Sequence, residues 1–226
     1  MEVADAQRVK ALVPLIAKTD RIDARVLADL SYRDLVPAIW LSPPAVRGMR
    51  ELGRFRLHLV RHRSALKNRI HSTLITRGRP VPVSDLFGVT GWRLLDDLEL
   101  PEAWFRSTLA TLEVIDHLDT QIGRCAAQLR RAAAEHREAE LLQTAPGIGP
   151  VLGFTIASEI GDITRFASPK KLVGYTGLCS RVYQSGDTDR RGPLTKHGPR
   201  WLRWALIEAA THTNGIPPTA TGINTS

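Results

Sequence analysis

Residues that could attack a phosphodiester gather in the last quarter of the chain. Ser185 stands in Gln184-Ser185-Gly186, which predicts a tight turn, and a group of cations follows it: Arg190, Arg191, Lys196, Arg200 and Arg203. A serine hydroxyl is a weak nucleophile at neutral pH, so such an attack needs a base, a metal ion or fixed positive charge around the transition state. The cations could supply that charge, and His197 could move a proton. The alternative, that Ser185 is there only for turn chemistry, stays open on the pattern alone.

A second candidate is the glycine-punctuated turn Pro146-Gly147-Ile148-Gly149-Pro150, which precedes an apolar helix. Glycines let a backbone approach a phosphate, and the free amides at a helix start favour an anion. With Lys170 and Lys171 not far along the chain, we expect Gly147 and Gly149 to grip a nucleic-acid backbone as a helix-hairpin-helix element does. The alternative is a plain tight turn between two helices.

Two carboxylates near the start of the chain are spaced for one face of a helix. Asp20 and Asp23 could share a divalent cation. The alternative is mechanical, with Asp20 as the N-cap and Asp23 at the third helical position. Two carboxylates are too few for a magnesium site that carries out phosphoryl transfer.

Composition favours a polyanionic partner. The chain has 226 residues, 43% hydrophobic, with a formal net charge of +8 and a pI near 10.1. Nucleic acid is the first expectation, and an anionic membrane surface is the rival. No apolar run could span a bilayer and no leader-like segment opens the chain, so we expect a cytoplasmic protein. Two cysteines give neither a zinc cluster nor a disulfide framework.

Apolar spacing predicts a mainly helical chain. Long helices are expected at about 44–76 and 102–140, and shorter ones at 151–160, from Pro169 with Ser168 as N-cap, and at 200–211. The two long helices suggest an antiparallel hairpin or coiled coil, which would be a spacer or a dimerisation arm. The first is strongly basic, and its outer faces are either solvated or in contact with a nucleic-acid backbone; its cations are Arg47, Arg50, Arg54, Arg56, Arg61, Arg63, Lys67 and Arg69.

Several spaced motifs together resemble one family of transposases. Lys18-Thr19-Asp20-Arg21-Ile22-Asp23-Ala24 is similar to the end of the nuclease-like domain in the insertion-sequence one-ten family. The run from Pro146 through Asp162, Phe166 and Lys171-Leu172-Val173-Gly174-Tyr175-Thr176-Gly177-Leu178 to Gln184-Ser185-Gly186, Gly192, Lys196, Gly198 and Leu202-Arg203 resembles its C-terminal domain.

The resemblance implies a fold and a division of the chain. It implies a mainly α chain with a remnant of an RNase-H-like α/β domain at 1–43 and a helical coiled-coil arm at 44–140. A small α-helical serine domain follows at 141–213, with a flexible tail at 214–226.

The resemblance also implies an activity. Members of the family are recombinases that act as oligomers on DNA, guided by a bridge RNA, without a membrane. Ser185 would form a phosphoserine link to DNA and free a 3′ hydroxyl, and Asp20 and Asp23 would belong to a magnesium-binding carboxylate quartet. Phosphate contacts would come from Arg190, Arg191, Lys196 and Arg200, and the protein would be cytoplasmic and nucleoid-associated.

The family's earlier strands, with their Asp and Glu, have no counterpart here. We therefore expect an N-terminally truncated member that cannot complete the metal site alone and whose apolar face around Val26, Leu27 and Leu30 is exposed. The alternative function is a non-catalytic nucleic-acid-binding fragment that at most joins or modulates a full-length transposase.

Overall fold

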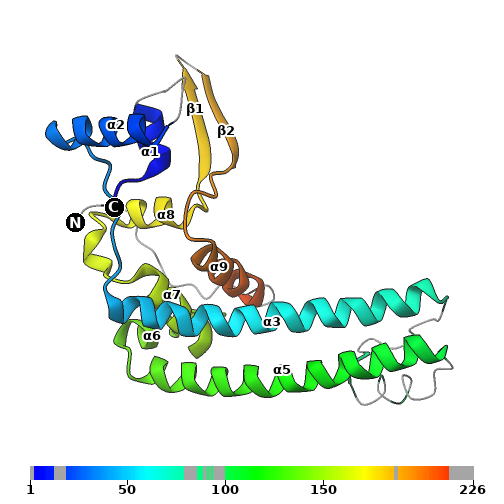
Figure 1. The fold of residues 1–226 in the computed structure, drawn as a ribbon. Helices are drawn as coiled ribbons and strands as arrows, with labels where there is room; N and C mark the ends of the chain where they lie inside the picture. Colours follow the sequence, from blue (N-terminus) through cyan, green and yellow to red (C-terminus); the bar gives the residue numbers. More distant parts are fainter. Residues whose placement is uncertain are drawn as a thin grey trace. The chain divides into compact units, whose positions relative to one another are not determined.

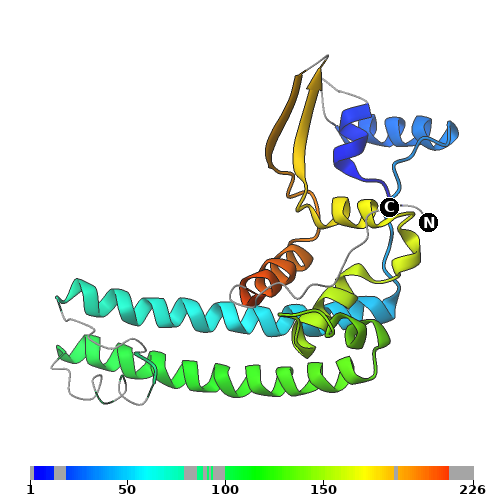
Figure 2. The same ribbon diagram turned by 180° about the vertical axis from the view of Figure 1, so that it is seen from behind.

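The computed structural model describes residues 3–12, 19–78, 86–88, 91, 93, 100–185 and 188–213. The chain forms two compact units, Met1–Pro44 and Ala45–Ser226, and each is described by itself. In the described part the chain is mainly helical, with a single two-stranded sheet (Figures 1 and 2), so the prediction of a mainly α protein is confirmed. No helix in those ranges has both the length and the apolarity that crossing a bilayer requires.

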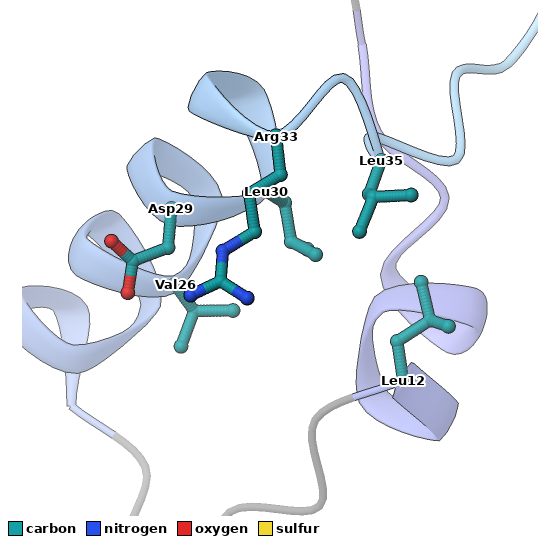
Figure 3. A pocket seen from close by; sticks show the side chains of 6 residues that line it. All are labelled: Leu12, Val26, Asp29, Leu30, Arg33 and Leu35. Atoms are coloured by element: carbon teal, nitrogen blue, oxygen red, sulfur yellow. The ribbon is translucent and has the colours of Figure 1, made fainter.

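The first unit contains two helices, α1 (Ala6–Leu12) and α2 (Asp20–Tyr32). Backbone pairing of Ala4 with Ala38 holds the entry of α1 against the exit from α2. A cavity of about 360 Å³ opens between the helices, lined by Leu12, Val26, Asp29, Leu30, Arg33 and Leu35 (Figure 3). The predicted exposed face is only partly correct, because Leu27 is 41% exposed whereas Leu30 is buried.

Two 33-residue helices, α3 (Pro44–Thr76) and α5 (Glu102–Ala134), run side by side in the second unit. Ile70 and Leu74 of α3 pack on Leu112 and Ile115 of α5 towards one end of the pair. Their periodic apolar spacing is what predicted the helices, and α3 has the bounds expected from the sequence.

Helix α7 (Pro150–Ile160) is the centre of the second unit. Every residue from Leu152 to Glu159 is buried, as expected for a helix that is apolar on all sides. Phe154 and Ala157 pack with Leu129 of α5, and Ile156 packs with Leu202 of α9 (Arg200–Thr213). The short helix α6 (Arg137–Leu142) covers another side of α7.

Helix α3 meets α7 through one narrow face. A Cβ on Gly53 would lie 3.3 Å from Thr155 Oγ1, so the glycine permits close approach of the two helices. Arg54 donates from Nε and Nη2 to the two Glu159 carboxylate oxygens at 2.6 and 2.8 Å. Arg50 donates to the carbonyl oxygens of Ser158 and Glu159, both at 2.8 Å. The hydrogen bond to Glu159 raises the pKa of Arg54 above its ordinary value, which keeps the guanidinium charged.

Three sequence-based expectations need correction. The helix predicted at 102–140 ends at Ala134, and α6 begins at Arg137 after an extended His136. This bend lets Ala133 and Ala139 enter the same apolar cluster.

The apolar spacing of the helix predicted at 102–140 also places Leu109 on its inner side, but Leu109 is 41% exposed. The C-terminal part is not purely helical, since β1 (Ser180–Ser185) and β2 (Thr188–Leu194) form an antiparallel hairpin between α8 (Pro169–Thr176) and α9.

We expect Arg54→Ala to lower the free energy of unfolding by about 3–5 kcal/mol, because the buried Glu159 carboxylate loses both of its hydrogen bonds and keeps, among the described residues, only Arg50 Nε, 3.9 Å away. Urea unfolding followed by far-UV circular dichroism would measure the loss. Arg106→Ala is the matched control, since Arg106 pairs with Glu102 on an exposed face, and we expect a cost below about 1 kcal/mol. Equal losses for the two variants would contradict a structural role for the buried pair.

Candidate functional site

Ser185 is the last residue of β1 and lies directly opposite Thr188. Its side chain is exposed and makes no hydrogen bond to any other residue that the structure describes. Gly186 and Asp187, which complete the predicted turn, lie outside the described residues. The hydroxyl is therefore at the far end of a two-stranded ribbon, where a bulky substrate can reach it.

The register of β1 and β2 shows which residues lie on the same face of the hairpin as Ser185. Pairs Tyr183–Arg190 and Ser185–Thr188 are in register, so Tyr183, Ser185 and Arg190 share one face of the ribbon. Val182 pairs with Arg191 on the other face. Diagonal neighbours on one face lie about 7–8 Å apart, which a long arginine side chain can span. Of the two candidate arginines in β2, Arg190 and Arg191, only Arg190 is on the same face as Ser185.

Tyr183 is a site residue that the sequence analysis missed. Its ring lies over Gly192, where an added Cβ would come within 2.9 Å of Tyr183 Cε2. The side chain is nevertheless 56% exposed. Gly192 thus gives the ring room to lie across the hairpin, which places an open aromatic surface two residues before Ser185. In a strand, the spacing Tyr183-x-Ser185 puts the two side chains on the same face. The sequence indicates this only if the segment is known to be a strand.

The base of the hairpin is fixed to the end of α8. Lys196 N donates to Gly177 O at 3.0 Å, and Thr195 N donates to Cys179 O at 2.9 Å. A Cβ on Gly198 would lie 2.0 Å from Tyr175 O, so only glycine fits there. Lys196 itself has φ 55, an unusual conformation for a side chain of its size. The strand pair is therefore held at a defined place, and the exposed Lys196 side chain is held with it.

The remaining cations near the hairpin differ in whether their side chains are exposed or already bound to the protein. Arg203 donates from Nη1 to Gly198 O at 3.2 Å and so serves the loop rather than a ligand. Arg200, the first residue of α9, is exposed. Lys170 and Lys171 are exposed in the first turn of α8, whose predicted N-cap Ser168 has N-cap geometry but accepts no side-chain hydrogen bond.

The two glycines of the predicted phosphate turn are not equivalent. Gly147 has φ 81, and a Cβ there would lie 2.4 Å from Ala209 O of α9. Gly149 is the N-cap of α7, exposed, with nothing within 4 Å of an added Cβ. Packing alone therefore explains Gly147, whereas Gly149 has open space beside its Cα at the start of a helix, where an anion is favoured.

The carboxylates of the first unit lie in the first turn of α2, but neither is its N-cap. Thr19 is the N-cap, and its Oγ1 accepts from Ile22 N at 3.3 Å. The capping role considered for Asp20 and Asp23 is therefore wrong, because Thr19 fills it. Over the part of the chain that the structure describes, no three His, Cys, Asp or Glu side chains come together as metal ligands. The two aspartates by themselves do not fit a magnesium ion that needs about six oxygen ligands.

We expect Gly147→Ala to destabilise the protein by about 1–3 kcal/mol, because the Cβ meets the Ala209 carbonyl and the backbone has positive φ. Gly149→Ala has negative φ and free space, so its cost should stay within about 1 kcal/mol. Thermal unfolding of both variants would test this. Equal midpoints for the two variants would show that the contact with α9 does not require a glycine.

Comparisons with known proteins match two segments of the chain to transposases. A family model described as the transposase IS116/IS110/IS902 family matches residues 139–220, which include the hairpin and α9. A second model, a transposase of the DEDD type of IS110, matches residues 2–76.

Individual proteins that resemble this chain are also named as transposases. The chain is 28% identical over 193 residues to y4qE of Sinorhizobium fredii, whose name proposes a transposase, covering 85% of this chain and 47% of that protein. It is 26% identical to the transposase for insertion sequence element IS1328 of Yersinia enterocolitica, covering 85% of this chain and 58% of the relative. A stretch of 97 residues is 36% identical to the pilin gene-inverting protein of Moraxella bovis, covering 42% and 28% of the two chains. The chain spans about half the length of the curated relatives it matches along most of its own length. On these matches, the chain carries transposase domains of the IS116/IS110/IS902 family at both of the matched segments.

Proposed function

We propose that the chain takes part in DNA transposition by cutting and joining DNA through Ser185. The observation that carries the proposal is the exposed hydroxyl at the end of the β1–β2 ribbon, on the same face as Arg190. Arg190 has no ion-pair or hydrogen-bond partner among the described residues. A free guanidinium beside a nucleophile is suited to a phosphate that gains negative charge during attack.

The proposed reaction has two balanced steps. Ser185 Oγ attacks the phosphorus of a DNA phosphodiester, the bond from phosphorus to the 3′ oxygen breaks, and the 3′ oxygen leaves as a hydroxyl. The serine proton passes to solvent or a base, and the leaving oxygen takes up a proton. In the second step a 3′ hydroxyl attacks the phosphoserine, which restores the phosphodiester and releases the serine. Neither step changes an oxidation state.

Magnesium, a guide RNA and self-association belong to the same proposal. Each is implied by the family resemblance, and the net charge of +8 supports nucleic-acid partners. Asp20 and Asp23 lie on one face of α2 and are not occupied by capping, so they are available to join oxygen ligands from elsewhere.

The test compares Ser185→Ala with Ser180→Ala, since Ser180 is the exposed serine at the other end of the same strand. The substrate is a labelled plasmid that carries the DNA flanking the chain's own gene. Denaturing gels would detect a covalent protein–DNA adduct. With Mg²⁺ and a full-length family member added to supply the remaining metal ligands, we expect the wild type and Ser180→Ala to form it and Ser185→Ala to lose it by a factor of about 10³ or more.

The outcomes separate the two function classes. DNA binding without an adduct in any variant would support the alternative, a nucleic-acid-binding fragment that at most joins or modulates a full-length transposase. An adduct that survives in Ser185→Ala would overturn the assignment of the nucleophile.

Because Arg190 and Arg191 lie on opposite faces of the hairpin, we expect their substitutions to have different effects. Arg190→Gln should lower adduct formation about 10–100-fold, because it removes the cation on the serine side. Arg191→Gln, on the opposite face, carries the same charge change and should cost clearly less. Single-turnover adduct rates at saturating DNA would measure both. A larger loss for Arg191→Gln would mean that the substrate phosphate lies on the other face of the ribbon.

A further inference from the structure

The structure separates the cations of α3 into those held by the protein and those left open. Arg50 and Arg54 bind Ser158 and Glu159, and Arg63 Nη1 donates to Asp119 at 2.6 Å. Arg61 is different. It is exposed, and within the described ranges it has neither an ion pair nor a hydrogen bond. Basic sequence alone did not distinguish it from its neighbours on the helix.

Arg61 is held in place by an aromatic ring of another element. Its Cζ lies 4.7 Å from the centroid of the Trp201 ring. Arg200 Cζ lies 4.6 Å from the centroid of the same ring. Trp201 is partly buried and is followed by Leu202, which is completely buried in the core around α7. The indole is therefore a fixed platform that joins α3 to α9 and carries two guanidinium groups.

Stacking fixes the plane of a guanidinium but leaves its N–H donors unused. Arginine has five such donors in a rigid fork that matches a phosphate. Arg200, like Arg61, has no carboxylate partner in the described part of the chain. Two like charges that share one ring repel each other, and an anion that bridges them would relieve that repulsion.

The surroundings add positive charge rather than offset it. Arg200 is the first residue of the 14-residue helix α9, which has no acidic residue in its first turn. The helix dipole therefore adds to the charge of the side chain. Lys196 precedes it by four residues, on the loop that follows the serine hairpin. Both arginines are open to solvent, so a long polyanion can reach them as readily as a free ion.

We propose that Arg61 and Arg200, held on Trp201, form a binding site for a backbone phosphate of nucleic acid. Trp201 is a positioning residue, because it acts by orienting the two guanidinium groups. The site deepens the proposed function and rests on it, since it supposes that the chain binds nucleic acid. It connects the long helix α3 to the domain that carries Ser185 through one shared phosphate contact.

The experiment measures binding of the full chain by fluorescence anisotropy. The probes are a DNA duplex of about 30 base pairs and a single-stranded RNA of about 30 nucleotides, each from about 50 to 200 mM KCl. Arg61→Gln and Arg200→Gln should each weaken binding of at least one probe about 3–10-fold at low salt and reduce the salt slope by about 1. Arg124→Gln, which removes an exposed arginine of α5, is the control for charge and should leave binding nearly unchanged.

Variants of the platform test positioning separately from charge. Trp201→Phe keeps an aromatic face and should bind almost as the wild type does. Trp201→Leu keeps the net charge but loses the platform, and we expect it to resemble Arg61→Gln. Thermal unfolding of each variant checks that the fold is intact. Tight binding by a folded Trp201→Leu would overturn the role of Trp201.

Three further results would each be decisive. If wild type binds but Arg61→Gln and Arg200→Gln weaken binding no more than Arg124→Gln, the site is wrong while the proposed function stands. If wild type binds neither probe at low salt, the proposed nucleic-acid function fails. If inorganic phosphate raises the melting temperature of wild type but not of Arg61→Gln, while nucleic-acid binding is equal in both, the site takes free phosphate instead.

Discussion

The second unit depends on a buried carboxylate, that of Glu159, which accepts two hydrogen bonds from the guanidinium group of Arg54. Glu159 is 1% exposed at the end of a helix buried along its length, and burying a charge there is costly unless it is paired. Arg54 pairs with it through both oxygens, and Arg50 binds the adjoining carbonyl groups. This arrangement favours one register of α3 against α7, because only there can Arg54 bind the carboxylate while Arg50 binds the adjoining carbonyl groups. α7 in turn holds α5, α6 and α9, so the position of the long helices and of the domain that carries Ser185 follows from the same contact.

Local patterns were sufficient for the long helices but not for the contacts between them. The bounds of α3 follow from apolar periodicity and from Pro44 at the helix start, and the existence of α7 follows from its continuous apolar run after Pro150. The Arg54–Glu159 pair joins residues 105 positions apart, and no local spacing indicates it. The bend at Glu135–His136 contains neither glycine nor proline, so tertiary packing of the flanking alanines was needed to reveal it. RNase-H-like ancestry of the first unit and a coiled coil in the arm stay predictions.

The serine hairpin escaped prediction for a physical reason. Alternation of apolar and polar residues marks a strand that has one buried face, but every residue of β1 is exposed. A ribbon with both faces in solvent therefore has no hydrophobic alternation, and the residue types around Ser185 predict only a turn. The same exposure is what makes Ser185 accessible. Ser185 and Arg190 could both be selected from the sequence. Only the strand register separates Arg190, on the face of the serine, from Arg191 on the opposite face, and adds Tyr183 to the site.

A net charge of +8 says little about where a polyanion would bind, because the fold uses many of the cations itself. Arg203 serves a loop carbonyl, and Arg63 pairs with Asp119. Arg56 is half-buried. Burial is the main cause that lowers the pKa of its guanidinium, and repulsion from Arg63 is the second. Such residues contribute to the long-range field but cannot give up their places to a phosphate without cost to stability. What remains for recognition is a smaller set whose geometry is fixed by neutral partners, such as the indole of Trp201 under Arg61 and Arg200. An aromatic platform orients a guanidinium without consuming its hydrogen-bond donors, whereas a carboxylate orients it by consuming them. This difference is the reason why we propose Arg61 and Arg200, and not Arg54 or Arg63, as phosphate-binding cations.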